Sequence, residues 1–309
     1  MKFSLALTPY GRFPDHHAVL KTAALAERCG FYAVNFGDHI GVPLSHKGAI
    51  DTMYYDPLVM AMAITSQNPR IRVYFNVLVI PYRQPVPLAK AIATLDVLSG
   101  GRVIVGAGLG LVEAEFQAVG ATLKARVSMT EEYIRAMKVL WAGGPATFQG
   151  RHVSFRDIIS EPLPVQKPHP PIWMALTGVP RGLVRAAELG DGAAVLNQPR
   201  ENLKRDLDEL RRLLVQRGRR PEEFSLQFSL YYGQVLEEHR AHFRVGGSMI
   251  YDVLSAEPDE ALRQIEDYAS LGITHLSLRH SARSYEEFER QLLPFHERVL
   301  QPLSRMKPG

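Results

Sequence analysis

The chain has 309 residues, of which 46% are hydrophobic, and its formal net charge is only +4. This length allows a large buried core, either one (β/α) barrel or two smaller domains. No run of Lys and Arg is interleaved with aromatic residues, so a nucleic-acid surface is not expected. The single cysteine, Cys29, excludes a disulfide framework and a cysteine-based metal site, and it indicates a reducing, cytoplasmic compartment. The short apolar run that opens the chain predicts a strand and no membrane span.

Short apolar segments alternate with longer amphipathic segments along the chain. The short segments predict strands buried on both faces. The longer segments predict helices, because their apolar residues recur at spacings of three and four. The predicted strands are residues 3–7, 32–36, 72–79, 102–107, 172–176, 193–196, 224–231 and 274–278. The predicted helices are residues 17–29, 56–67, 87–99, 129–141, 181–189, 201–216, 258–271 and 284–300.

Eight alternating strand and helix units predict the fold. Strict alternation implies parallel strands joined by helical crossovers. Eight units in one domain, residues 1–309, favour a closed (β/α)8 TIM barrel over a doubly wound open sheet. Active sites of such barrels lie on the loops that follow the strands. Residues 145–171 are rich in Pro, Gly and aromatic residues and have no long period, so we expect an insertion that helps to cover the substrate.

A glycine-rich stretch follows the fourth predicted strand. Gly106, Gly108 and Gly110 lie at its carboxyl end. Glycines at this place let the backbone approach a ligand closely. A tight turn from strand to loop, with no ligand, explains the same pattern equally well.

The same stretch carries a resemblance to a known family. The segment LDVLSGGRVIVGAGLG, residues 95–110, is followed by Glu115, Phe116 and Gly120. It resembles the central signature of the luciferase-like monooxygenase superfamily and is most similar to its deazaflavin-dependent branch. The resemblance implies a TIM barrel, a small organic substrate and a homodimer.

The resemblance also implies a cofactor. The leading prediction is an oxidoreductase that transfers hydride between coenzyme F-420, a deazaflavin, and a small organic substrate. The first alternative is an FMN-dependent monooxygenase that uses reduced flavin and oxygen. The second alternative is a noncatalytic barrel relative. In either cofactor-binding case, Gly106, Gly108 and Gly110 are expected beside the cofactor.

The second predicted strand leads to Asp38 and His39. A histidine just past a barrel strand is placed to exchange a proton with a bound molecule, and Asp38 is a candidate to fix its tautomer. The alternative is a histidine that only caps its loop. An Asp-His pair here is a hallmark of the superfamily, and the resemblance implies that His39 lies beside the reactive ring. We therefore predict that His39 and Asp38 are catalytic.

The third predicted strand contains a polar residue, Asn76, which is typical of a β-bulge. The resemblance implies a non-proline cis peptide between Asn76 and Val77, behind the cofactor ring. The alternative is an ordinary strand with a satisfied Asn. Arg83 follows, and we expect it either to meet an anionic part of the cofactor or to be solvated.

The loop after the fifth predicted strand contains Leu176, Thr177, Gly178 and Val179. It precedes a helix, whose free amide groups and positive end suit a phosphate. The alternative is a helix N-cap at Thr177. The resemblance implies that this loop binds the cofactor phosphate.

Two further features limit the prediction. Some deazaflavin dehydrogenases of the family have an acid-base Glu directly after the last glycine, where this chain has Leu111. Glu115 is expected to position its loop or helix. Sugar or alcohol oxidation is therefore not predicted, and the substrate stays open. His16 and His17 have no further ligand nearby, so they are expected to be exposed and to bind no metal.

Overall fold

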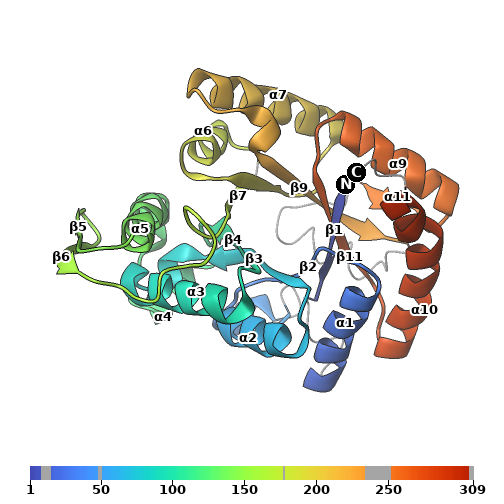
Figure 1. Cartoon of the computed structure of the whole chain (residues 1–309), viewed down its shortest axis with the longest axis horizontal. Coiled ribbons are helices and arrows are strands. Elements are labelled where there is room, and N and C mark those ends of the chain that lie inside the picture. Colours follow the sequence, from blue (N-terminus) through green and yellow to red (C-terminus); the bar gives the residue numbers. More distant parts are fainter. Residues whose placement is uncertain (8–14, 48–50, 177, 234–251, 306–309) are drawn as a thin grey trace.

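The computed structural model describes residues 1–7, 15–47, 51–176, 178–233 and 252–305. Within these residues, eight parallel strands close into a barrel, because the last strand, β11, pairs with β1 and β8 pairs with β9 (Figure 1). The predicted TIM barrel is confirmed. In their order around the barrel the strands are β1 (Lys2–Ala6), β2 (Ala33–Phe36), β3 (Arg72–Val79), β4 (Val103–Gly108), β7 (Ile172–Leu176), β8 (Gly192–Val195), β9 (Ser225–Tyr232) and β11 (His275–Arg279).

Helices surround the barrel on its outside (Figure 1). Each of the predicted helices is present, and α5 begins three residues earlier than the pattern indicated. The helices are α1 (His16–Arg28), α2 (Pro57–Gln67), α3 (Pro85–Ser99), α5 (Arg126–Trp141), α6 (Pro180–Leu189), α7 (Arg200–Gln216), α9 (Pro258–Ser270) and α10 (Tyr285–Phe295), with the short α4 (Glu113–Ala118) and α11 (Gln301–Arg305). None of the described helices combines the length and the apolar character that a membrane crossing requires.

The segment between α5 and β7 contains an antiparallel hairpin that the sequence did not predict. Its strands are β5 (Ala146–Gln149) and β6 (Ser154–Ile158), and they lie beyond α5, at the outer edge of the molecule (Figure 1). The Glu132 carboxylate on α5 accepts hydrogen bonds from three successive backbone amides of the hairpin turn. Gln166 then bonds to the Val103 carbonyl, at the amino end of β4. The prediction that this segment helps to cover the substrate stays a prediction.

The described strands fill the barrel interior with side chains. Tyr74, Ile104, Trp173 and Ala194 form one apolar cluster there. Another part of the interior is filled by the Asn35 side chain, whose amide donates hydrogen bonds to the hydroxyls of Ser4 in β1 and Ser277 in β11. The filled interior leaves the loops at the carboxyl ends of the strands as the place for a ligand.

Candidate active site

One buried carboxylate ties together the loops that follow β2, β3 and β4. Glu115 lies in α4, and its side chain is fully buried. Its Oε2 lies 3.0 Å from His39 Nδ1 and accepts a hydrogen bond from the Tyr82 hydroxyl at 2.9 Å. Its Oε1 accepts the amide hydrogens of Ile40 and Gly41 at 2.8 and 3.2 Å. The loop that carries His39 is therefore held by a group 76 residues away in the sequence.

The environment of Glu115 keeps its carboxyl group ionised. Burial alone would raise the pKa of Glu115, but the hydrogen bond and charge of His39, the Gly41 amide and the Tyr82 hydroxyl lower that pKa below its ordinary value. An ionised carboxylate only accepts hydrogen bonds, so Nδ1 of His39 carries the hydrogen. Nε2, on the far side of the ring, is then the nitrogen that can exchange a proton.

Asp38 has different partners from those expected. Its buried carboxylate accepts the Val79 amide hydrogen at 3.0 Å and pairs with both terminal nitrogens of Arg83, at 2.6 and 3.1 Å. Arg83 also contacts Asp56 at 3.1 Å. The prediction that Asp38 fixes the His39 tautomer is wrong, because Glu115 faces Nδ1 instead. Arg83 is not solvated, since its guanidinium joins these two carboxylates, and its expected contact with the cofactor stays a prediction.

The predicted bulge in β3 is confirmed. The pairing of β3 with β4 shifts register between Phe75 and Leu78, and the Asn76–Val77 peptide is cis. Within the described part of the chain, the Asn76 amide nitrogen is buried and has no hydrogen-bond partner. A buried donor of this kind is rare without a partner, so it suits an acceptor atom on a ligand.

The loop glycines are explained first by packing. A side chain on Gly106 would overlap the Phe75 carbonyl oxygen, and one on Gly108 would overlap Val77. Gly110 has a φ of +74° and approaches the ring of Phe116. Strand β4 therefore needs glycines to lie against the bulged strand β3. This packing accounts for them without a ligand, while the predicted cofactor contact stays a prediction.

We expect Gly106→Ala to lower the free energy of unfolding by about 3 kcal/mol, because the new methyl group has no space beside the β3 backbone. Chemical denaturation would measure this change. Gly182→Ala is the matched control, since its methyl group would meet Leu176 at an ordinary 3.7 Å inside α6. The control should keep or slightly raise stability. Equal stabilities of the two variants would contradict the packing argument.

The loop after β7 leads directly into α6. Thr177 lies outside the described residues, so the predicted N-cap there is not tested. In the structure the cap position is Val179, and no side chain among the described residues caps the first turn of the helix. Gly178 has a φ of +73°, and an added side chain would press on Gln198 and Asp206. The open helix start suits an anion, as predicted for this loop.

Tyr54 is a site residue that the sequence pattern did not reveal. Its ring meets the His39 imidazole edge-on, with 4.8 Å between the ring centres. Burial and the charge of Asp51 raise the pKa of Tyr54 to about 12. The hydroxyl is therefore protonated at neutral pH and is able to donate a hydrogen bond. No motif surrounds Tyr54, so only its place beside His39 identifies it.

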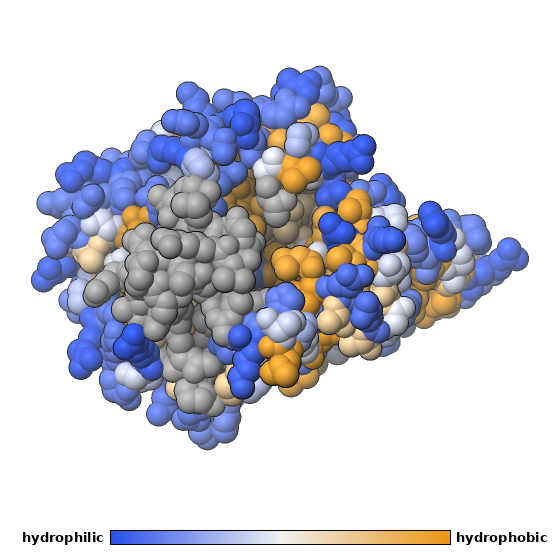
Figure 2. Space-filling model, turned by 180° about the vertical axis from the view of Figure 1, so that it is seen from behind, coloured by the Kyte–Doolittle hydropathy of each residue, from blue (hydrophilic) through white to orange (hydrophobic). Residues whose placement is uncertain are grey.

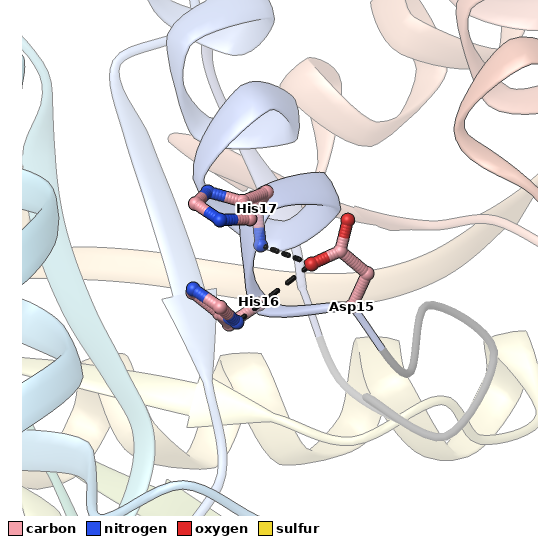
Figure 3. A group of neighbouring side chains, drawn as sticks. All are labelled: Asp15, His16 and His17. Atoms are coloured by element: carbon pink, nitrogen blue, oxygen red, sulfur yellow. Dashed lines mark hydrogen bonds and ion pairs between the residues drawn. The ribbon is translucent and has the colours of Figure 1, made fainter.

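A second group of polar residues opens α1. His16 and His17 are exposed as predicted, but Asp15 lies beside them, and the three offer possible metal ligands (Figure 3). It is the one such group of three in the described residues. The Asp15 carboxylate already accepts the His17 amide hydrogen at 2.9 Å and caps the helix. We assign it this capping role.

Curated proteins similar to this chain include both F420-dependent and FMNH(2)-dependent enzymes. An F420-dependent glucose-6-phosphate dehydrogenase of Amycolatopsis mediterranei is 26% identical, over 92% of this chain and 94% of that protein. An FMNH(2)-dependent dimethylsulfone monooxygenase of Pseudomonas putida is 31% identical, over 50% of this chain and 41% of that protein. An uncharacterised protein of Mycobacterium tuberculosis is 33% identical, over 62% of this chain and 70% of its own.

Solved structures agree on the fold. A monooxygenase from Streptomyces bottropensis has a TM-score of 0.81 and 24% identity, covering 98% of this chain and 100% of its own. An F420-dependent secondary alcohol dehydrogenase has a TM-score of 0.77 and 19% identity, covering 97% and 98%. The family model for luciferase-like monooxygenase matches residues 3–245. This chain therefore belongs to the luciferase-like monooxygenase family of oxidoreductases.

Proposed function

We propose that the chain transfers hydride between the deazaflavin coenzyme F-420 and a small organic substrate. The observation that carries the proposal is the His39–Glu115 pair beside the bulge at Asn76, at the carboxyl ends of β2, β3 and β4. The deazaflavin is preferred to FMN because the F420-dependent relative aligns over 92% of the chain, against 50% for the FMN-dependent one. FMN-dependent monooxygenation is the second candidate function.

The residues present fit a cofactor of this kind. The buried Asn76 amide is a donor that suits an acceptor atom at the edge of a flat ring system. The uncapped start of α6, at Gly178 and Val179, suits a phosphate. Leu176, Thr177 and the glycines Gly106, Gly108 and Gly110 are proposed to complete the binding surface. When bound, the coenzyme supplies the hydride chemistry.

His39 is proposed to handle the proton that accompanies hydride transfer. Removing hydride from a carbon that carries an O–H or N–H group releases a proton. Nε2 of His39 is the ring nitrogen able to take that proton, because Glu115 holds the hydrogen on Nδ1. In the reverse direction the same nitrogen returns it. Asp38 is proposed to act only by fixing the loop, through Arg83 and Val79.

We expect the purified protein to bind the deazaflavin coenzyme more tightly than FMN, since a curated relative that aligns over 92% of the chain is F420-dependent. Titration with each coenzyme, followed by absorbance and fluorescence, measures both affinities. Micromolar binding of FMN without binding of the deazaflavin would reverse the proposal. Binding of neither would favour a noncatalytic barrel.

Two glycine variants test whether the cofactor phosphate binds at the start of α6. Gly178→Val is expected to weaken coenzyme binding about tenfold or more, because the new side chain presses on Gln198 and Asp206 beside the start of α6. Gly218→Val is the control, with a similar φ of +66° and open space around it. Equal affinities of the two variants for the coenzyme, at equal thermal midpoints, would indicate that the phosphate binds at another place.

The expected partners follow from the family resemblance. We propose a homodimer that acts on a small organic molecule and uses neither nucleic acid nor a membrane. The single cysteine, Cys29, is buried and free, which supports the proposed cytoplasmic location.

A further inference from the structure

Large aliphatic side chains are exposed at the carboxyl end of the barrel. They lie on the loops that follow four strands, namely β2, β4, β7 and β8. Figure 2 shows hydrophobic side chains gathered on one face of the molecule. The exposed fractions in these loops are 41% for Ile40, 84% for Leu44, 74% for Leu111, 52% for Val179 and 39% for Leu196. We call these five residues the aliphatic rim.

The aliphatic rim is continuous with the candidate active site. Ile40 follows His39, and its amide donates to Glu115. Leu111 follows Gly110 at the end of the loop glycines, and Val179 occupies the N-cap position of α6. The rim residues therefore lie at the same end of the barrel as the groups that we propose to bind the cofactor and to move the proton.

The inner wall beneath the aliphatic rim is also apolar. Ala194 of β8 packs into the interior cluster with Trp173. Side chains alternate along a strand, so Leu196 continues on the same inward side as Ala194. Val77, at the bulge of β3, packs against this interior cluster as well. A molecule that entered through the aliphatic rim would contact hydrocarbon side chains at the rim and at the inner wall.

We propose that the aliphatic rim binds the hydrocarbon part of the substrate, a molecule whose larger part is aliphatic. The inference rests on the proposed function and specifies the substrate class. Single exposed aliphatic residues are ordinary on a protein surface, but a group of them beside a catalytic group marks a binding site.

Unbranched primary alcohols from butanol to octanol test the proposal as probes. Ligand-observed NMR titration of the purified chain gives a Kd for each alcohol, with and without saturating coenzyme. Each added methylene that enters the aliphatic rim should tighten the Kd by about fourfold. A Kd that does not change along the series would overturn the proposal.

Two leucine variants separate the aliphatic rim from general surface hydrophobicity. Leu111→Gln is expected to weaken octanol binding about threefold or more and to leave butanol nearly unchanged. Leu98→Gln is the matched control, because Leu98 is 63% exposed in the last turn of α3, which lies at the other end of the barrel. Leu98→Gln should leave the Kd of every alcohol in the series unchanged. Equal effects of the two variants would overturn the proposal.

The remaining outcomes distinguish the substrate from other occupants. Sedimentation of Leu111→Gln should match that of the original chain. A change of oligomeric state together with unchanged octanol binding would show that the rim is a subunit contact, and it would overturn the proposal. Coenzyme affinity, measured separately, tests the proposed function. Length-dependent alcohol binding without coenzyme binding would reject the proposed function alone, whereas coenzyme binding without length dependence would reject the aliphatic substrate alone.

Discussion

His39→Ala is expected to lower the single-turnover rate of hydride transfer about 100-fold or more. A positioned proton donor or acceptor acts mainly in the transition state, so its loss reduces turnover far more than binding. Coenzyme affinity should stay within about threefold of the original value. Rapid mixing of the coenzyme-loaded protein with substrate, followed by absorbance, measures the rate, and titration measures the affinity.

His46→Ala is the matched control for this experiment. His46 lies in the same loop after β2, but it is exposed, and among the described contacts its imidazole bonds only to the neighbouring Ser45. Its loss should leave the rate unchanged. If His39→Ala reacts at the original rate when fully loaded with coenzyme, His39 is not catalytic. The proton would then have to pass through another group, with Tyr54 the nearest candidate.

The barrel could be predicted from sequence because its signals are local. Each buried strand is a short apolar run, and each covering helix shows an apolar period of its own. The hairpin of β5 and β6 lacks such a signal, since most of its residues are exposed and its two aromatic side chains, Phe148 and Phe155, stack on each other. Its position outside α5 also depends on Glu132, whose three amide contacts no local pattern predicts.

The candidate site was predicted only in part. The resemblance identified His39 and the Asn76–Val77 peptide, and the structure places both at the carboxyl ends of neighbouring strands. The partner of His39 was misjudged because Asp38 is its neighbour in sequence. Adjacent residues of an extended chain point to opposite sides, so Asp38 turns toward Arg83 while His39 turns toward Glu115.

The loop glycines show a similar limit. Their spacing is compatible with a ligand, but the steric demand on Gly106 comes from the Phe75 carbonyl of the neighbouring strand. That demand exists because β3 bulges at this point, which shifts its register against β4. A sequence pattern cannot measure the distance between two strands, so it could not separate packing from ligand contact.

Glu115→Gln is expected to lower the single-turnover rate about 100-fold, because it reverses the tautomer of His39. Glutamine can keep its carbonyl oxygen on the Ile40 and Gly41 amides, which leaves its NH2 group facing Nδ1. Nδ1 must then accept, and the hydrogen moves to Nε2. In a Ser-His-Asp triad, the comparable change of Asp to Asn costs about 10⁴ in turnover.

The same substitution should change how stability depends on pH. The pKa of Glu115 is lowered from its ordinary value of 4.5, so the ionised group stabilises the fold above that pH. We expect Glu115→Gln to reduce the free energy of unfolding by about 2 kcal/mol at neutral pH. This difference should shrink as the pH falls below about 4.5 and the original carboxylate takes up a proton. Denaturation at several pH values measures it.

Nitrogen-15 NMR of labelled histidine reads the tautomer directly and separates positioning from simple stabilisation. The original chain should show hydrogen on Nδ1 of His39, and Glu115→Gln should show it on Nε2. Tyr82→Phe is the matched control, because it removes one donor to the same carboxylate and leaves an acceptor facing Nδ1. It should keep both the tautomer and most of the rate. If Glu115→Gln also keeps hydrogen on Nδ1 and reacts at the original rate, Glu115 only ties the loops together, and the imidazole is oriented by its contact with Tyr54.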